Sequence, residues 1–222
     1  MTPVMIAFHN QIEDQIRIGV ITANGIHMNS ANPELEKRLD EILEQRKQPL
    51  SREEDNFRKA CRDMMRIGAY KPTGRGKPSS EYLLRAAGEE DFPRINAVTD
   101  INNYVSLKYL TPISLWDLDK IEATSWLFRP GNDDESFVFN KSGQTIDLKD
   151  LITGFAVTET REEPVATPVK DCQKTKTDAS TRNLAVAIYY PAGWEGQPAL
   201  SSIIDEFSEL LDCISEKVEN RQ

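Results

Sequence analysis

The chain has 222 residues, of which 39% are hydrophobic and 28% charged, and its formal net charge is −9. This length can bury a substantial core without disulfides or metal ions, and the ordinary composition argues against fibrous and disordered classes. The negative net charge repels phosphate polymers on average, so it argues against strong, sequence-independent binding of nucleic acid.

The cysteines and histidines bear on the cellular compartment and on metal binding. Three scattered cysteines, Cys61, Cys172 and Cys213, lack the spacing of a zinc site or a disulfide framework, which favours a reducing compartment. Neither His9 nor His27 has a cysteine or carboxylate at ligand spacing, so we expect no metal and no cofactor. The chain shows no signal-peptide pattern and no run of about 18 apolar residues, so we expect a cytoplasmic protein without membrane contact.

The charge is unevenly distributed along the chain. Residues 58–85, the basic window, contain eight lysines and arginines against Asp63 and Glu81, so the window carries +6 and the remainder −15. Two interpretations stay open: a patch that faces phosphate groups, or charges on the solvated faces of helices.

The first half of the chain predicts two strands followed by helices. Asn32 as cap and Pro33 at the first helical position are typical of a helix start. Ser51 and Glu54 form the capping-box pattern of a second helix. Residues 71–78 are rich in proline and glycine and predict a loop without regular structure. The predicted strands lie at residues 4–8 and 16–22, and the predicted helices begin at 33 and 51 and span 79–87 and 97–110.

The second half of the chain changes to the two-residue period of strands. Short alternating or apolar runs separated by turn signals predict strands at 125–129, 136–140, 144–148, 152–160 and 184–190. Residues 198–218 have one broad apolar face and predict an amphipathic helix that covers a sheet. No repeat or clean linker is present, so we expect a single domain over residues 1–222, of the α+β class.

The predicted helix at 97–110 and the segment after it contain polar side chains inside an apolar pattern. Asp100 and Asn103 lie on one face of this helix with Leu107 and Leu110. Asp117 directly follows Trp116, and Asp119 comes two residues later. Buried amides and carboxylates are costly unless their hydrogen-bonding groups are satisfied. These residues therefore have a specific task.

Two interpretations of these polar residues remain open. In the first, Asp100 and Asn103 anchor the backbone of the following loop, and the two later aspartates cap the next turn. In the second, they line a pocket that orients a small polar ligand against Trp116 and Tyr104.

Common catalytic motifs are missing from the sequence. There is no Gly-x-x-x-x-Gly-Lys phosphate loop, and the Gly-Arg-Gly-Lys run at 74–77 lacks the required spacing and preceding strand. No Gly-x-Ser-x-Gly elbow occurs, so serine hydrolase chemistry has no support.

Three segments carry a resemblance to a known family: PSSEYLLRA at 78–86, INAVTDINNYVSLKYLTPISLWDLDKI at 95–121 and TKTDASTRNLAVAI at 175–188. Together they resemble the B3/B4 domain of the phenylalanyl-tRNA synthetase beta subunit, and more closely its free-standing single-domain form. The resemblance spans about residues 70–190. It implies a three-layer α+β fold in which a β-sandwich of unusual topology is flanked by helices.

In the synthetase this domain hosts the editing site, where tyrosine wrongly attached to the phenylalanine tRNA is hydrolysed. The resemblance places Asn102 and Asn103 at polar pocket positions, with Asn102 in place of the usual threonine. The pocket residues that we expect from the pattern and the resemblance are Asp100, Asn102, Asn103, Ser114, Trp116 and Asp117.

The sequence departs from the editing pattern at three places. The segment Pro-Met-His-Ala-Phe-Asp of the bacterial synthetases is here residues 112–117, with Ser114 at the position of the editing histidine. The glycine pair of the editing pocket has no counterpart near 169–178, and the glutamate that contacts the tyrosine hydroxyl corresponds to Ala187. Ser114 cannot serve as a general base at neutral pH, so whether the protein is an enzyme stays open.

Three functions are compatible with these observations. The leading hypothesis is RNA binding, with tRNA or its aminoacylated 3′ end as partner and Arg75, Lys77 and Arg85 as phosphate contacts. The alternatives are a trans-acting deacylase of misacylated tRNA, and a regulatory protein that binds a small molecule such as a free amino acid.

Overall fold

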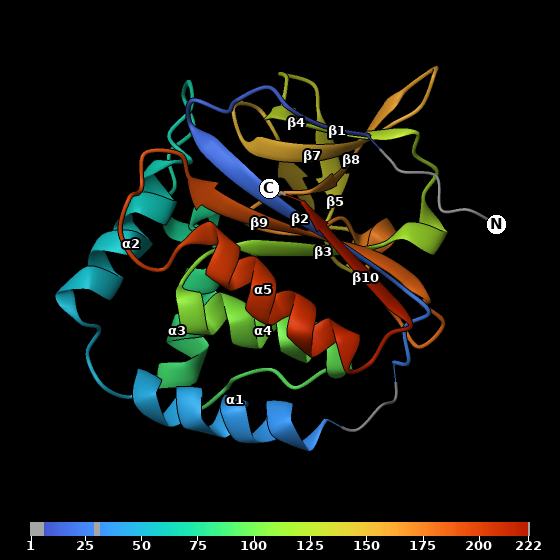
Figure 1. The fold of residues 1–222 in the computed structure, drawn as a ribbon. Coiled ribbons are helices and arrows are strands. Elements are labelled where there is room, and N and C mark those ends of the chain that lie inside the picture. Colours follow the sequence, from blue (N-terminus) through green and yellow to red (C-terminus); the bar gives the residue numbers. More distant parts are fainter. Residues whose placement is uncertain (1–6, 29–31, 222) are drawn as a thin grey trace.

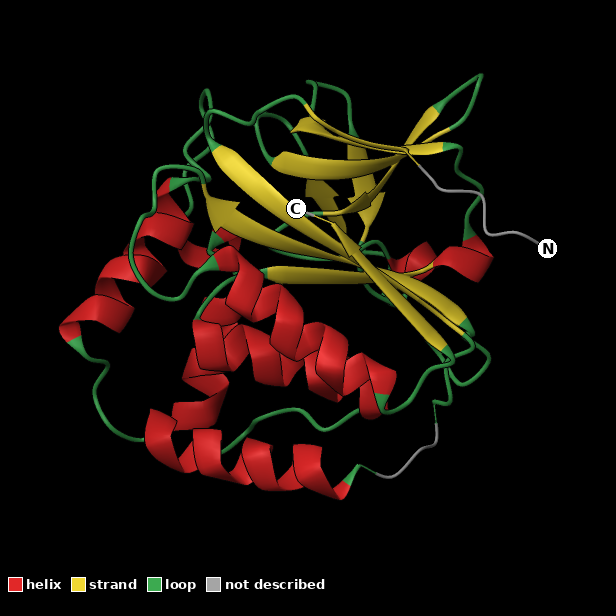
Figure 2. Ribbon diagram, viewed as in Figure 1, coloured by secondary structure: helices red, strands yellow, loops and turns green. Residues whose placement is uncertain are grey.

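The computed structural model describes residues 7–28 and 32–221, and in this part of the chain the elements form three layers (Figure 1). A layer of helices covers one face of a four-stranded sheet, and a second four-stranded sheet lies across the other face (Figure 2). This arrangement agrees with the predicted α+β class and with helices that flank a β-sandwich.

The middle sheet has the strand order β10-β2-β9-β3, and each pair of neighbouring strands is antiparallel. Its strands are β10 (Lys217–Arg221), β2 (Ile16–Asn24), β9 (Asn183–Pro191) and β3 (Ile113–Asp117). The two central strands, β2 and β9, pair over nine residues each, so the sheet has a long, stable centre and two short edges.

The outer sheet has the order β1-β4-β7-β8. Its strands are β1 (Ala7–Asn10), β4 (Ser125–Pro130), β7 (Ile152–Val157) and β8 (Glu162–Ala166). The pair β1 and β4 is parallel, and the other pairs are antiparallel. A separate hairpin is formed by β5 (Ser136–Val138) and β6 (Thr145–Asp147).

Aromatic side chains fill the space between the two sheets. The rings of Trp116 in β3 and Trp126 in β4 lie 5.1 Å apart, centroid to centroid, in an edge-on arrangement. Phe128 in β4 contacts Tyr189 in β9 in the same way, at 6.1 Å. Such pairs add to the free energy gained by burial, so they fix how the sheets are stacked.

The helical layer consists of α1 (Pro33–Arg46), α2 (Arg52–Asp63), α3 (Ser79–Gly88), α4 (Ala97–Tyr109) and α5 (Leu200–Asp212). α4 is buried along most of its length because α1, α3 and α5 all pack against it. α5 lies directly on β2, where Gly19 permits the contact: a Cβ at Gly19 would come within 2.6 Å of Cδ1 of Ile204. The predicted sheet-covering helix is thus confirmed.

Local signals in the sequence are confirmed where they are strong. Asn32 accepts a hydrogen bond from the backbone N–H of Leu35, and Ser51 and Glu54 form both bonds of a capping box. α4 ends at Leu110, whose φ of 57° is left-handed, just before Thr111 and Pro112. The strands predicted in the second half of the chain are all present, with shifts of a few residues at their ends.

Other predictions from the sequence were wrong. The helix predicted over 198–218 ends at Asp212, and Lys217–Arg221 form the edge strand β10. β3 and β8 were not predicted: β3 is buried on both faces and so lacks alternation, while β8 begins with two glutamates and a proline. The loop at 71–78 contains one 3-10 turn, η1 (Gly74–Gly76). The strand predicted at 4–8 falls mostly outside the described residues, and only its end belongs to β1.

No helix in the described part of the chain is both long enough and apolar enough to span a membrane.

Candidate functional site

A cavity of about 320 Å³ lies between the first turn of α3, the middle of α4, the start of β3 and the turn that follows β8. This volume is at the lower end of small-molecule sites. Its polar lining includes Tyr82 from α3, Asn102 and Asn103 from α4, and Lys170 and Asp171 from the turn. The structure thus brings together three distant segments of the chain.

Hydrogen bonds fix the turn after β8. The hydroxyl of Thr167 accepts from the backbone N–H of Lys170 at 3.0 Å and donates to the carbonyl of the same residue at 2.8 Å. The carbonyl of Pro168 accepts from the backbone N–H of Ser79 at 2.8 Å, which joins the turn to the start of α3. The cavity wall is therefore held from both sides.

Asp171 is the cavity residue that the sequence analysis missed. The backbone N–H of Leu115 lies 3.5 Å from its Oδ2, and its Oδ1 is buried without a hydrogen-bond partner among the described residues. Burial raises the pKa of this carboxyl to about 7, against smaller opposite effects of the Ser114 hydroxyl and nearby lysines. In the sequence, a single aspartate between lysine-rich stretches gives no signal that it is buried.

Asn102 and Asn103 both line the cavity, as expected from the resemblance, and both side chains are buried. The Nδ2 of Asn102 is 3.5 Å from the Oδ1 of Asn103, whereas the Oδ1 of Asn102 has no partner in the described part of the chain. Buried polar atoms are nearly always hydrogen-bonded in folded proteins. Asn102 and Asp171 therefore leave unused hydrogen-bonding capacity at this cavity.

Positive charge gathers at the rim of the cavity. The Nζ of Lys170 lies 4.7 Å from the ring centroid of Phe139 and 5.7 Å from that of Tyr82. Burial lowers the pKa of Lys170, and the nearby charges of Lys176 and Arg75 lower it further. Lys170 has no ion pair with any described carboxylate, so its charge is available to a ligand.

Two cations, Lys170 and Arg85, lie near the ring of Tyr82. The guanidinium carbon of Arg85 lies 5.6 Å from its ring centroid, within the range of a cation–π contact, and its hydroxyl donates to the carbonyl of Gly74. The aromatic side chain at the cavity is thus Tyr82, whereas the sequence analysis expected Trp116 and Tyr104.

Three predicted pocket residues lie away from this cavity. Trp116 is buried between the sheets against Trp126. The hydroxyl of Tyr104 donates to Glu206 of α5 at 2.8 Å, on another side of α4. Asp100 accepts a 2.8 Å hydrogen bond from the backbone N–H of Ile95, so it anchors the loop that precedes α4. Each of these three side chains makes a packing or hydrogen-bond contact elsewhere, and none of them lines the cavity.

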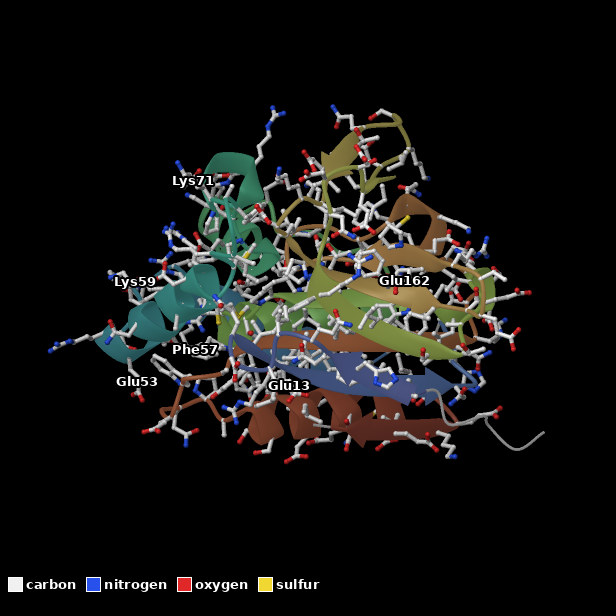
Figure 3. All side chains as sticks on the ribbon, turned by 90° about the horizontal axis from the view of Figure 1, so that it is seen from above. Glu13, Glu53, Phe57, Lys59, Lys71 and Glu162 are labelled. Carbon is white, nitrogen blue, oxygen red and sulfur yellow. The ribbon has the colours of Figure 1, made fainter. Side chains whose placement is uncertain are left out.

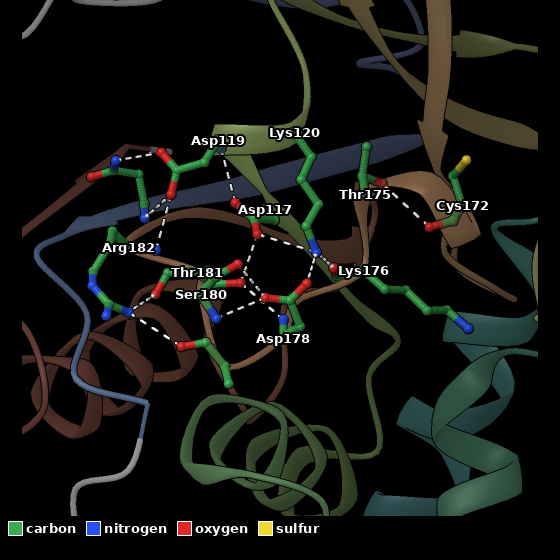
Figure 4. Close-up of polar contacts among 12 residues, drawn as sticks. Asp117, Asp119, Lys120, Cys172, Thr175, Lys176, Asp178, Ser180, Thr181 and Arg182 are labelled. Carbon is green, nitrogen blue, oxygen red and sulfur yellow. Dashed lines mark hydrogen bonds and ion pairs between the residues drawn. The ribbon is translucent and has the colours of Figure 1, made fainter.

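Asp117 and Asp119 form a polar network with the segment that leads into β9 (Figure 4). Asp117 accepts from the backbone N–H of Asp119 at 2.9 Å and so caps the 3-10 turn η2 (Leu118–Lys120). Asp119 accepts from the backbone N–H groups of Arg182 and Asn183 at 2.9 and 3.0 Å. The capping interpretation therefore agrees with the geometry of Asp117, whereas Asp119 lies within the turn and holds the start of β9.

Ser114 lies beneath the cavity wall and has no exposed surface. Its hydroxyl is 2.9 Å from the carbonyl oxygen of Thr167, to which it donates, and 3.1 Å from the hydroxyl of Tyr189. The hydroxyl is therefore occupied by hydrogen bonds within the protein.

The basic window divides into two parts. On α2, Arg58 and Arg62 both pair with Glu81, and Lys59 pairs with Asp55. In the loop after α2, Lys71, Arg75 and Lys77 form no ion pair with another described residue. Figure 3 shows Lys59 and Lys71 on the side of the molecule that α2 occupies. Within the described basic window, the cations without an ion pair therefore lie in the loop after α2.

Arg85, the third expected phosphate contact, pairs weakly with Glu89. Their closest atoms are 3.7 Å apart, and both side chains are more than 60% exposed. Such an exposed pair contributes little free energy, so Arg85 can exchange this partner for another anion.

A second hollow, of about 770 Å³, lies between β1 and β2 and includes His9 and Arg17. None of its lining residues has a buried polar atom without a partner in the described structure. No group of three or more histidine, cysteine or acidic side chains that could hold a metal was found in the described ranges. The cavity beside Asn102 and Asp171 is therefore the better candidate.

Comparison with protein-family models matches residues 61–193, more than half of the chain, to the B3/4 domain. The chain belongs to the B3/4 domain family. All residues that line the cavity, and the loop cations beside it, fall inside the B3/4 match.

Two proteins resemble the B3/4 chain. A phenylalanine–tRNA ligase beta subunit from Streptococcus mutans is 33% identical over 113 residues, which is 50% of this chain and 13% of the length of that subunit. The crystal structure of an N-terminal fragment of the phenylalanyl-tRNA synthetase beta subunit from Pyrococcus horikoshii aligns with 97% of this chain and 50% of the fragment. The TM-score is 0.48 and the sequence identity 8%.

Proposed function

We propose that this B3/4 protein binds tRNA, with the aminoacylated 3′ end in the cavity beside Asn102 and Asn103. Phosphate groups of the RNA would lie on Arg75, Lys77 and Arg85. The observation that supports this most directly is a polar, amino-acid-sized cavity whose rim carries cations without ion-pair partners.

The relationship to the beta subunit of a tRNA ligase supports tRNA as the RNA. The charge distribution supports a local mode of binding. The net charge of −9 repels RNA over most of the surface, while the loop at 71–77 carries three cations and is joined to the cavity residue Tyr82 by a hydrogen bond to Gly74. Attraction limited to one rim orients the RNA end toward the cavity.

The experiment is a filter-binding titration of uncharged and aminoacylated tRNA at 50 and 200 mM salt. Because each phosphate contact releases counterions, we expect the affinity to fall steeply with salt. The double substitution Arg75→Glu and Lys77→Glu should weaken binding at least tenfold and reduce the salt slope by about two, roughly one per lost contact.

A control is Lys217→Glu, which reverses an exposed charge on β10. β10 and β3 are the two opposite edges of the middle sheet, so Lys217 lies far from the cavity. This control should bind as the wild-type protein does. Equal affinities at both salt concentrations, or equal effects of loop and control variants, would show that the proposal is wrong.

A further inference from the structure

We propose that the adjacent residues Lys170 and Asp171 recognise an α-amino acid group, with Asp171 receiving its ammonium and Lys170 facing its carboxylate or ester oxygen. The inference rests on the cavity of the proposed function and names the chemical group that this cavity takes. The group can come from a free amino acid or from the aminoacyl end of a tRNA.

The first support is the unsatisfied carboxyl of Asp171. Its Oδ1 has no hydrogen-bond partner in the described residues, and its other close groups are the N–H of Leu115, at a long 3.5 Å from Oδ2, and the hydroxyl of Ser114. An ionised carboxylate offers acceptors only, and its strongest partners are charged N–H donors. A ligand ammonium supplies three such donors.

The second support is a further acceptor at the same cavity. The Oδ1 of Asn102 is buried and also lacks a partner among the described residues, and Asn102 and Asp171 line one cavity from opposite segments. Two acceptors without donors complement a group that donates several hydrogen bonds, which an ammonium does and a phosphate does not.

The third support is the order of charge along the turn. Lys170 is half-buried at the rim between Tyr82 and Phe139 and has no described acidic partner, while its neighbour Asp171 is inside. An α-amino acid group carries an ammonium and a carboxylate or ester oxygen, so it offers a partner to each of these two side chains.

The charged and polar groups around Asp171 set the pH dependence of binding. Lys170 and Lys176 favour its ionised form, as does the Ser114 hydroxyl, while burial beside Tyr189 disfavours it. The pKa of the empty site is about 7, so an ammonium must bind best when this carboxyl is ionised. Affinity should fall by about tenfold for each pH unit below 7, because one proton competes with the ligand.

The test uses the full chain and the twenty standard L-amino acids as probes, with calorimetry and thermal shift at pH 8. The best-binding amino acid is then compared with its N-acetyl derivative, which lacks the ammonium, and its methyl ester, which lacks the carboxylate. We expect the N-acetyl derivative to lose at least tenfold in affinity. The ester should retain binding that depends less on Lys170.

Asp171→Asn is the deciding variant, since it keeps the size of the side chain and removes a buried charge, so that folding is preserved. It should lose at least tenfold in affinity for the amino acid and lose the pH dependence between 6 and 8. Asp133→Asn, on an exposed side chain 74% accessible to solvent, is the matched control and should bind normally.

A parallel arm compares uncharged tRNA with the same tRNA aminoacylated and N-acetyl-aminoacylated. Preference for the free amino group that disappears in Asp171→Asn supports the inference with tRNA as the source, even if no free amino acid binds. Amino acid binding without any tRNA binding supports the inference and contradicts the proposed function.

Equal binding of acetylated and free amino groups in both arms would overturn the inference. So would equal binding by Asp171→Asn and the wild-type protein. A lack of response to every amino acid, together with no preference among the three tRNA forms, would show that only water occupies the cavity.

Discussion

The hydroxyl of Thr181 donates a 2.6 Å hydrogen bond to the buried Oδ2 of Asp117, and the Nζ of Lys120 lies 3.5 Å from the same oxygen. Asp117 ends β3, and Thr181 lies two residues before the start of β9. Because β3 and β9 are neighbours, this contact fixes the edge of the middle sheet from which the cavity wall continues.

Removal of the Asp117 carboxylate should destabilise the protein without affecting the cavity. Asp117→Ala leaves the buried hydroxyl of Thr181 without its acceptor, while Lys120 keeps Asp178, so we expect the free energy of unfolding to fall by about 1–3 kcal/mol. Urea denaturation of this variant, Thr181→Val and the double variant measures the coupling. If the two single losses simply add, the contact is not a joint one.

Asp171→Asn should stabilise the protein in a pH-dependent way. The folded-state pKa of Asp171, about 7, is higher than its ordinary value of 3.8, so the folded protein holds this proton more tightly than the unfolded chain. The stability present below pH 4 is therefore lost as the pH rises from 4 through 7. Asparagine does not titrate, so the variant escapes this loss.

The measurement is the melting temperature of Asp171→Asn and the wild-type protein at pH 5 and pH 8 without ligand. The variant should exceed the wild-type protein in the free energy of unfolding by about 1–3 kcal/mol more at pH 8 than at pH 5. A difference that is constant with pH would mean that the carboxyl does not titrate in this range.

The ion pairs of Glu81 should matter more for stability than the exposed pair of Glu89. The Glu81 side chain is only 9% exposed and joins α3 to Arg58 and Arg62 of α2. Glu81→Gln should lower the free energy of unfolding by about 1–3 kcal/mol, since Arg62 loses its carboxylate partner and Arg58 keeps only Asp55. Glu89→Gln is the matched control and should change stability by less than about 0.5 kcal/mol. Equal effects would exclude a helix-joining role for Glu81.

The contact between α5 and β2 requires a glycine. Gly19→Ala places a methyl group 2.6 Å from Cδ1 of Ile204, so α5 must shift or the isoleucine must change its rotamer. We expect a loss of about 1–3 kcal/mol in thermal or chemical denaturation. The added substitution Ile204→Val removes the clashing methyl and should restore part of the loss; a further loss instead would show that the clash is not the cause.

Much of the fold could be predicted from sequence because its signals are local. The caps at Asn32 and Ser51 and the apolar face of residues 198–212 depend on neighbours within a few positions. β10 was missed because its pairing partner, β2, lies at the other end of the chain, and β3 because burial on both faces leaves no alternation.

The candidate site shows the same division. The sequence by itself determined the helix that carries Asn102 and Asn103, the likeness to the B3/4 family and the loop cations, because these are properties of short segments. Only the tertiary structure decided that Trp116 and Asp117 serve the sheets, that Arg58 and Arg62 of α2 pair with Glu81 of α3, and that Asp171 reaches the cavity. Burial and the choice of hydrogen-bond partner depend on which distant segments pack together, and a turn docked on the start of α3 is what encloses the carboxyl of Asp171.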